Sequence, residues 1–267
     1  MSHELSVFLF TFGLFLGMLL FLEIGRRVGI RRRKEDAGAG GEGIGALDGA
    51  VFTLLGLLIA FTFSGASSRF DTRRELIVEE TNDIGTAYLR LDLLPPGAQL
   101  ALRESFRRYL DARIEAYQKL PDLAAAQESL AKANELQLLI WRQAVAASVA
   151  PGAPPQAPIL LLPALNAMID ITTTRTMAAR MHPPAVVFAM LFGLALAASL
   201  LAGYGMAGSK MRRWFHILGF AFVTAVAVYV ILDMEYPRLG LIRVDAFDQA
   251  LIDLRESMNR DIQISGK

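Results

Sequence analysis

The chain has 267 residues, of which 54% are hydrophobic and 20% are charged, and its formal net charge is +1. The apolar residues are concentrated in a few long blocks, which is typical of a membrane protein rather than of a soluble protein with a large core. The near-neutral charge gives no reason to expect nucleic acid as a partner. The chain has no cysteine, which excludes disulfides, thiolate metal sites and cysteine nucleophiles. The composition therefore predicts the lipid bilayer as the main partner.

The first apolar block, residues 5–24, is long enough to cross a bilayer, which needs about 20 residues. It lacks the basic leading region and small-residue cleavage site of a signal peptide, so we expect an uncleaved membrane helix. A basic loop is expected next, with Arg26, Arg27, Arg31, Arg32, Arg33 and Lys34. The glycine-rich linker at residues 37–45 matches a dinucleotide-binding fingerprint by letter, but charges precede it where that motif needs a hydrophobic strand.

The second span is expected at residues 47–67, and it is not uniformly apolar. Small and weakly polar residues recur at spacings of three and four, which places them on one face of a helix: Thr53, Gly56, Ala60, Phe63, Ser64 and Ser67. This set is named the stripe. Two interpretations stay open: close packing between helices, which small residues permit, or a pore with a constriction at Phe63, because hydrophobic necks can gate by dewetting.

No helix breaker separates this span from a charged segment at residues 69–94, named the stalk. We therefore expect one helix, or two in near continuity, from residue 45 to residue 95. The stalk carries these charges: Asp71, Arg73, Arg74, Glu79, Glu80 and Asp83. Carboxylate oxygens suit a divalent cation such as calcium. Arginines of the same segment can pair with the same acids, so we expect an ion-paired surface and no metal.

The polar insert between the second and third spans has a helical pattern throughout. A turn at residues 95–97 precedes helices at residues 98–120, 123–149 and 159–181, with Asp122 as the N-cap of the second and Pro163 near the first turn of the third. Nothing in the insert alternates with period two, so an antiparallel set of helices is expected. The third and fourth spans are predicted at residues 185–206 and 215–232, and an amphipathic tail follows.

The predicted fold class is an all-α membrane protein with four transmembrane helices and a helical extramembrane insert between the second and third. Its expected divisions are residues 1–66, 67–183, 184–233 and 234–267. Basic residues in the two short loops place those loops in the cytoplasm of a bacterial inner membrane, and the insert in the periplasm. Arg69, Arg73 and Arg74 beside the second span oppose this orientation.

The sequence offers no pattern of catalytic or metal-binding residues. His3, His182 and His216 are far apart, whereas a metal site would cluster them with carboxylates. No nucleophile elbow, phosphate-binding loop or zinc-protease motif is present, and Ser64, Ser67 and Ser68 have no partner base nearby in sequence. We therefore expect neither an enzyme nor a cofactor.

Residues 54–95 and 232–258, together with the four-span layout, resemble a bacterial family of unknown function termed bestrophin-like. That family is remotely similar to the bestrophins, which are homopentameric anion channels lined by their second spanning helix. The resemblance implies a homo-oligomer, by analogy a pentamer, with an ion pore along the stripe. A non-conducting membrane scaffold or sensor, whose helical domain binds a partner or ligand, is the alternative.

The sequence departs from the bestrophins in its neck and in its charge distribution. The bestrophin neck has a proline followed by consecutive phenylalanines, whereas here Thr62 separates Phe61 from Phe63 and no proline is present. The bestrophin insert is cytosolic, whereas the basic loops of this chain predict the opposite side.

Overall fold

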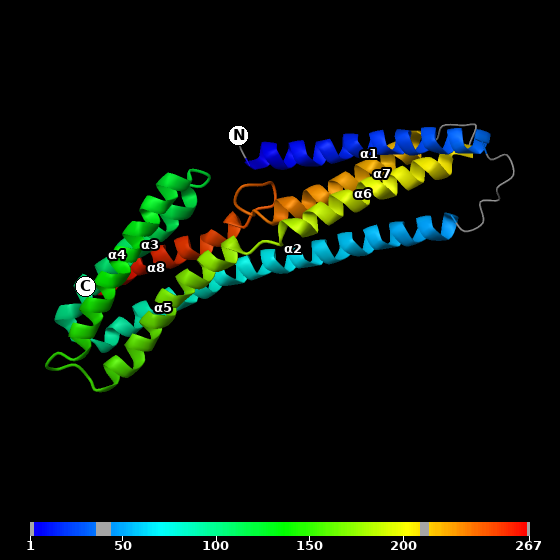
Figure 1. The fold of residues 1–267 in the computed structure, drawn as a ribbon. Helices are drawn as coiled ribbons and strands as arrows, with labels where there is room; N and C mark the ends of the chain where they lie inside the picture. The colour runs from blue at the N-terminus through cyan, green and yellow to red at the C-terminus, as the bar shows by residue number, and fades with distance from the viewer. Residues whose placement is uncertain (1–2, 36–43, 209–213, 266–267) are drawn as a thin grey trace. The chain divides into compact units, whose positions relative to one another are not determined.

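The computed structural model describes residues 3–35, 44–208 and 214–265. The regular structure in these ranges is entirely helical (Figure 1). In chain order the elements are α1 (His3–Glu35), α2 (Ile44–Leu89), η1 (Arg90–Leu93), α3 (Pro96–Gln118), α4 (Leu123–Ser148), α5 (Gln156–Arg180), α6 (Ala185–Gly205), η2 (Met206–Gly208), α7 (Trp214–Met234), η3 (Asp245–Asp248) and α8 (Gln249–Ser265). The expected all-α class is confirmed for the described residues.

The helices form two compact units. The membrane unit comprises Met1–Phe70 and His182–Ile242, and the helical unit comprises Asp71–Met181 and Arg243–Lys267. Helix α2 contributes its first part to the membrane unit and its last part to the helical unit. It is one uninterrupted helix, which was the first of the two forms expected for this segment.

Four helical stretches are long and apolar enough to cross a membrane: Glu4–Arg32, Leu47–Leu93, Gln156–Gly205 and Trp214–Met234. They include the four regions where spans were expected. The first is longer than expected, because α1 continues to Glu35 through the arginines that were assigned to a loop. Glu23 pairs with Arg26 and Arg27 at spacings of three and four, which supports the longer helix. The prediction of a loop at these arginines was wrong.

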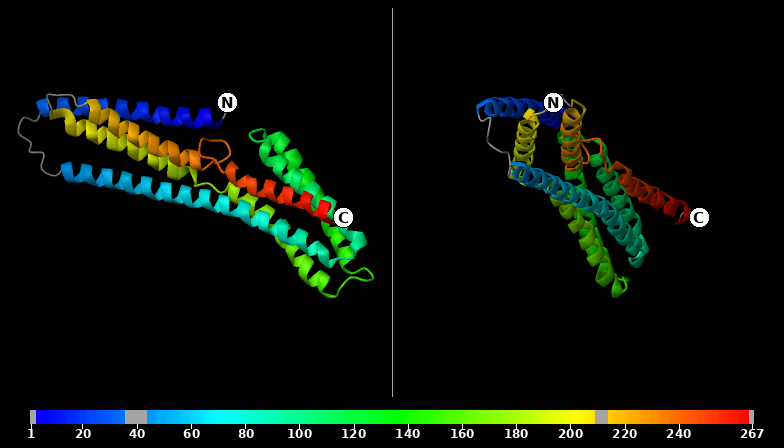
Figure 2. Two further views of the ribbon diagram at one scale, coloured as in Figure 1. Left: turned by 180° about the vertical axis from the view of Figure 1, so that it is seen from behind. Right: turned by 90° about the vertical axis from the view of Figure 1, so that its right-hand side faces the viewer.

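Helices α1 and α6 lie side by side in the membrane unit (Figures 1 and 2). Glycines line their contact. A Cβ added at Gly25 would lie 2.0 Å from the carbonyl oxygen of Leu200, and one added at Gly203 would lie 2.0 Å from that of Leu22. Only glycine permits such an approach, which is how helices pack closely in membranes. The closest backbone contact between these helices is therefore made by glycines of α1 and α6. The spacing of four residues between Gly25 and Gly29 was a signal for this contact in the sequence, and our prediction missed it.

Helix α2 joins the core of the membrane unit through its side chains. Leu55 and Ala66 are buried in the same apolar cluster as Met18 of α1. The ring of Phe52 meets that of Phe220 of α7 edge to face, with centroids 5.8 Å apart. Such pairs add about 0.5–1.5 kcal/mol beyond the burial of their area. Apolar side chains therefore hold one face of α2 on the unit.

The helical unit is built around the hairpin of α3 and α4. Asp122 caps α4 as expected, because its side chain accepts a hydrogen bond from the amide of Ala125 at 3.1 Å. Helix α5 begins at Gln156, so Pro163 lies well inside it rather than near its first turn as expected. The core of the unit includes Ile84, Leu91, Leu102, Phe106, Tyr109, Ile140, Leu161, Leu165 and Met168. Helix α8 packs on α3, where Arg255 binds Asp111 at 2.7 Å.

Candidate functional site

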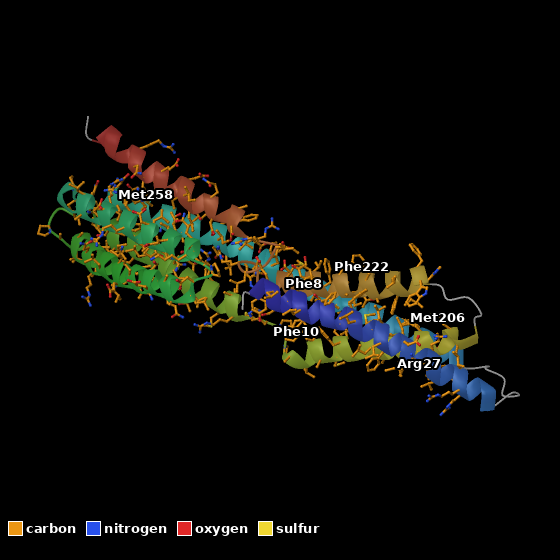
Figure 3. All side chains as sticks on the ribbon, turned by 90° about the horizontal axis from the view of Figure 1, so that it is seen from above. Phe8, Phe10, Arg27, Met206, Phe222 and Met258 are labelled. Atoms are coloured by element: carbon orange, nitrogen blue, oxygen red, sulfur yellow. The ribbon has the colours of Figure 1, made fainter. Side chains whose placement is uncertain are left out.

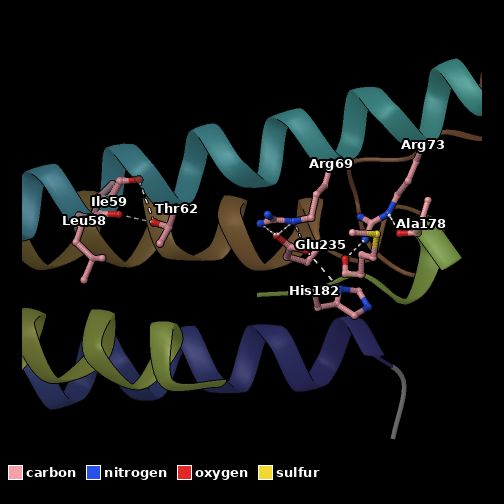
Figure 4. Close-up of polar contacts among 9 residues, drawn as sticks. Leu58, Ile59, Thr62, Arg69, Arg73, Ala178, His182 and Glu235 are labelled. Carbon is pink, nitrogen blue, oxygen red and sulfur yellow. Dashed lines mark hydrogen bonds and ion pairs between the residues drawn. The ribbon is translucent and has the colours of Figure 1, made fainter. Parts of the chain in front are cut away.

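One face of α2 is fixed to the membrane unit. Leu55, Thr62 and Ala66 are buried on this face. The hydroxyl of Thr62 donates to the carbonyl oxygens of Leu58 and Ile59, at 2.7 and 3.0 Å, so it needs no partner outside the helix (Figure 4). The only polar side chain named on this buried face therefore has its hydrogen-bond partners within α2 itself.

The stripe lies on another face of α2. Five of its members are exposed and Ser67 is half-buried: Thr53, Gly56, Ala60, Phe63 and Ser64. A Cβ added at Gly56 would meet no described atom within 4 Å. The hydroxyl of Thr53 donates to the carbonyl oxygen of Gly49 at 2.8 Å. The small residues thus leave space that no described part of the chain fills, unlike the glycines between α1 and α6.

A second exposed surface of α2 is built from larger apolar side chains. Leu54, Leu57 and Phe61 are 55, 49 and 67% exposed. Leu54 and Phe61 are seven residues apart and share one side of the helix, whereas Leu57, seven residues before Ser64, lies between that side and the stripe. Phe63 is 45% exposed and is the aromatic residue of the stripe. The helix therefore presents two different surfaces to its surroundings, one large and apolar and the other small with a single aromatic side chain.

Ionic contacts join three segments of the membrane unit where the spans end. Arg69 binds both carboxylate oxygens of Glu235, with its Nε 3.0 Å from Oε1 and 3.2 Å from Oε2 (Figure 4). His182 Nδ1 lies 3.3 Å from Oε2 of the same carboxylate, and its ring stacks on Tyr236 with centroids 4.5 Å apart. The side chain of Glu235 is 1% exposed, whereas that of Arg69 is 29% exposed. The buried carboxylate therefore holds α2 to the segments before α6 and after α7.

Asp233 organises the turn that follows α7. Its buried carboxylate accepts hydrogen bonds from the amides of Leu241 and Ile242, at 3.1 and 2.7 Å. A Cβ added at Gly240 would lie 2.1 Å from Oδ1 of Asp233, so the turn needs glycine there. The expected fourth span ended at residue 232, just before these acids, and no role was expected for Asp233 or Glu235. Two acids at the exit of an apolar helix were the available signal for these contacts.

The first stalk charges lie in the helical unit and bind in two ways. Arg74 pairs with Asp71 at 2.9 Å, as expected for an ion-paired surface, and lies over the ring of Phe247. Arg73 instead donates to the carbonyl oxygens of Ala178 and Met181, at 3.1 and 2.9 Å (Figure 4). Carbonyls at the C-terminus of a helix lack intrahelical partners and form the negative end of its dipole, which suits a cation.

Glu80 lies at the centre of a buried ionic cluster in the helical unit. Its side chain is 0% exposed, and Arg113 donates to its two oxygens at 2.6 and 3.0 Å. Arg175 donates to the second oxygen and stacks on Tyr117, with its guanidinium carbon 4.4 Å from the ring centre. Two guanidinium groups on one carboxylate favour its ionised form. The arginines come from α3 and α5, so the stalk alone gave no signal for them.

Tyr109 belongs to the same buried region. Burial, and after it the negative charge of Glu80, raises the pKa of the Tyr109 hydroxyl above its usual range. Gln137 donates to this hydroxyl at 3.1 Å. The phenol therefore stays neutral at physiological pH and contributes a polar atom to the core without adding a charge.

Glu79, another of the expected stalk acids, lies with Asp71 in the lining of a groove. The groove has a volume of about 560 Å³ and is lined by Asp71, Arg74, Glu75, Val78, Glu79, Asn82 and Phe247. Within residues 3–35, 44–208 and 214–265, no group of three or more acidic or histidine side chains is placed to hold a metal ion. Asp83, the last of the expected stalk charges, is half-buried. The expected stalk residues thus divide between one surface pair, the C-terminus of α5, the groove and the buried cluster, and Asp83 belongs to none of these groups.

One comparison with known proteins identifies a family, and another finds a similar fold. A family model described as a Bestrophin-like domain matches residues 10–246. No curated protein matches the sequence. The crystal structure of a mutant of a bacterial bestrophin homolog from Klebsiella pneumoniae has a similar fold, with a TM-score of 0.63 and 14% sequence identity over 90% of this chain and 98% of that one. With four helical stretches suited to a membrane and a family model matching most of its length, this chain belongs to the Bestrophin-like family.

Proposed function

We propose that the protein is a subunit of an oligomeric ion channel whose pore is lined by the stripe of α2. The observation that carries the proposal is that the stripe is exposed in the single chain, while a different face of α2 is buried on the membrane unit. A pore-lining surface has this property, because it must face the axis of the assembly rather than its own subunit. Family membership and the shared fold support the same function.

Phe63 forms the constriction in this proposal. It is the large side chain among small ones, so a ring of Phe63 side chains narrows a pathway that is wider at Gly56 and Ala60. A narrow apolar ring can exclude water and thereby stop ions. The hydroxyls of Ser64 and Ser67 lie within about one turn of Phe63 and keep the adjacent mouth wet.

The stripe carries no charge, so its side chains do not determine the sign of the permeant ion. We propose anion conduction through a homopentamer, on the resemblance to bestrophins alone. The reversal potential of the current in an asymmetric KCl gradient tests the sign. The symmetry of the purified particle in cryo-electron microscopy tests the subunit number.

Recordings from the purified protein in planar bilayers test the channel. Phe63→Ala should raise the conductance, because it widens the constriction, and Ser67→Asp should shift selectivity toward cations. Leu54→Ala is the matched control, because Leu54 is exposed on the other surface of α2 and should leave both properties unchanged. If both stripe variants behave as the wild type does, the pore assignment is wrong.

Particle symmetry separates the channel from the alternative scaffold or sensor. A ring of four or more copies with the stripe toward the axis is what the channel predicts, whereas a monomer or a two-fold dimer supports the scaffold. The absence of any current across many bilayers, combined with two-fold symmetry, would overturn the proposed function.

We also propose that the protein lies in the bacterial inner membrane with its helical unit in the periplasm. Arg69, Arg73 and Arg74 were the charges that opposed this orientation, and each binds protein groups in the structure. Labelling of single cysteines in intact cells with a membrane-impermeant maleimide tests the orientation. A cysteine at Leu100 should be labelled from outside and one at Arg31 should not; the reverse pattern contradicts it.

A further inference from the structure

A row of exposed side chains on α1 begins with apolar residues and ends with two arginines. The apolar members of the row recur at every fourth position and are 39–58% exposed: Leu16, Leu20, Ile24 and Val28. Arg31 and Arg32 are also exposed and occupy the next turn of the same row. Lipid that covers the apolar row therefore ends, at its headgroup, near these arginines.

The spacing along the helix agrees with this placement. Arg31 follows Ile24 by about 10 Å along the axis, at about 1.5 Å per residue. The headgroup layer on each side of a bilayer is roughly 5–7 Å thick. Side chains of a helix lean toward its N-terminus, which on α1 is the direction of the apolar row. A long arginine side chain on the last turns can therefore reach back to the headgroups.

The charges of this helix end differ in how they are paired. Arg26 and Arg27 bind the carboxylate of Glu23, at 3.1 and 2.8 Å. No ion pair joins Arg31 or Arg32 to an acidic side chain whose placement the structure describes, and both arginines are exposed. Their positive charge is therefore available to a ligand, whereas that of the first two arginines is partly neutralised.

The end of α1 that carries these arginines is braced by the rest of the membrane unit. A Cβ added at Gly29 would lie 2.6 Å from the Cβ of Ala207 and 2.9 Å from the carbonyl oxygen of Tyr204. Figure 3 shows Arg27 of α1 and Met206 of η2 at the same end of the unit. The exposed arginines thus project from a packed helix.

We propose that Arg31 and Arg32 form a binding surface for the headgroups of anionic phospholipids. The guanidinium group makes paired, charge-assisted hydrogen bonds to phosphate oxygens, and basic residues just beyond a membrane span are attracted to anionic lipid. A zwitterionic headgroup offers the same phosphate without net charge and binds more weakly. The surface is independent of the pore, because it lies on α1 and uses none of the stripe.

Native mass spectrometry of the full-length protein, titrated with phosphatidylglycerol and with phosphatidylcholine, tests the surface. The wild type should prefer phosphatidylglycerol, and Arg31→Gln and Arg32→Gln should each reduce the preference about fivefold. Arg31→Lys keeps the charge and should retain most of it. Glu23→Gln should increase it, because this change releases the charges of Arg26 and Arg27.

Arg142→Gln is the control for a lost surface charge, since Arg142 is exposed on α4 of the helical unit. It should leave the preference unchanged. The proposal is overturned if the wild type binds the two lipids equally, if Arg31→Gln keeps the wild-type preference in protein of unchanged oligomeric state, or if Arg142→Gln reduces the preference as much as Arg31→Gln does.

Discussion

The buried cluster around Glu80 makes the sharpest prediction about stability. Glu80→Gln keeps the size of the side chain and removes its charge, which leaves the guanidinium groups of Arg113 and Arg175 together without a counter-ion. Glu80 is 0% exposed, so water cannot replace the lost interaction. Removal of one partner from a buried ion pair costs about 3–5 kcal/mol. We expect about 3 kcal/mol here, because the glutamine oxygen can keep one hydrogen bond.

A thermal melt of the full-length protein in detergent, followed by circular dichroism, measures this effect. A loss of about 3 kcal/mol should lower the unfolding midpoint by roughly 6–12 °C in a chain of this size. Glu79→Gln is the matched control, because Glu79 is the preceding residue and is exposed, and surface changes usually stay within about 0.5 kcal/mol.

Replacement of the whole cluster tests the reason for the loss. The triple variant Glu80→Met, Arg113→Met and Arg175→Met leaves no unpaired charge, and exchange of a buried ionic cluster for apolar residues is often neutral or stabilising. We expect the triple variant to melt above Glu80→Gln. Equal midpoints for Glu80→Gln and Glu79→Gln would refute the account of a buried ionic cluster.

Three further changes test other contacts, with unfolding in detergent as the measurement. Gly25→Ala should destabilise the protein by about 1–3 kcal/mol or more, because the new Cβ would meet the backbone of Leu200. Gly193→Ala is the control and should not destabilise it, because a Cβ there meets nothing within 4 Å. Equal effects of the two changes would contradict the close α1–α6 contact. Glu235→Gln should cost about 1.5–3 kcal/mol through its lost charge-assisted bonds to Arg69, and an unchanged midpoint would show that these bonds contribute nothing. Asp122→Ala should cost about 1 kcal/mol as a lost N-cap, and no loss would mean that another group caps α4.

The sequence predicts the helices well because most of them carry a local pattern of their own, such as an apolar run or a capping residue. Apolar length locates the spans, and Asp122 marks the start of α4 at the residue found. The end of α1 was missed because a run of arginines reads as a loop, while the packing of Gly29 on η2 and the pairs to Glu23 keep it helical. The start of α5 was missed because prolines dominate that segment, although the first turn of a helix tolerates them.

The candidate site also has a part that the sequence predicts and a part that it does not. Helical spacing places the stripe on one face, which is a local property of α2. The partners of Glu80 and Glu235 could not be predicted, because Arg113 and Arg175 are far from Glu80 in sequence, as Arg69 is from Glu235. Contacts of this kind depend on how separate helices pack, and a single sequence does not encode that in any local pattern.

Single cysteines along α2 test the central claim, that the stripe lines an ion pore, and the natural chain has no cysteine to interfere. The variants Ser64→Cys, Leu54→Cys and Leu55→Cys place a thiol on the stripe, on the other exposed surface and on the buried face. A charged methanethiosulfonate reagent, applied during recording in planar bilayers, should change the current of Ser64→Cys alone. A change for Leu54→Cys with none for Ser64→Cys would contradict the account.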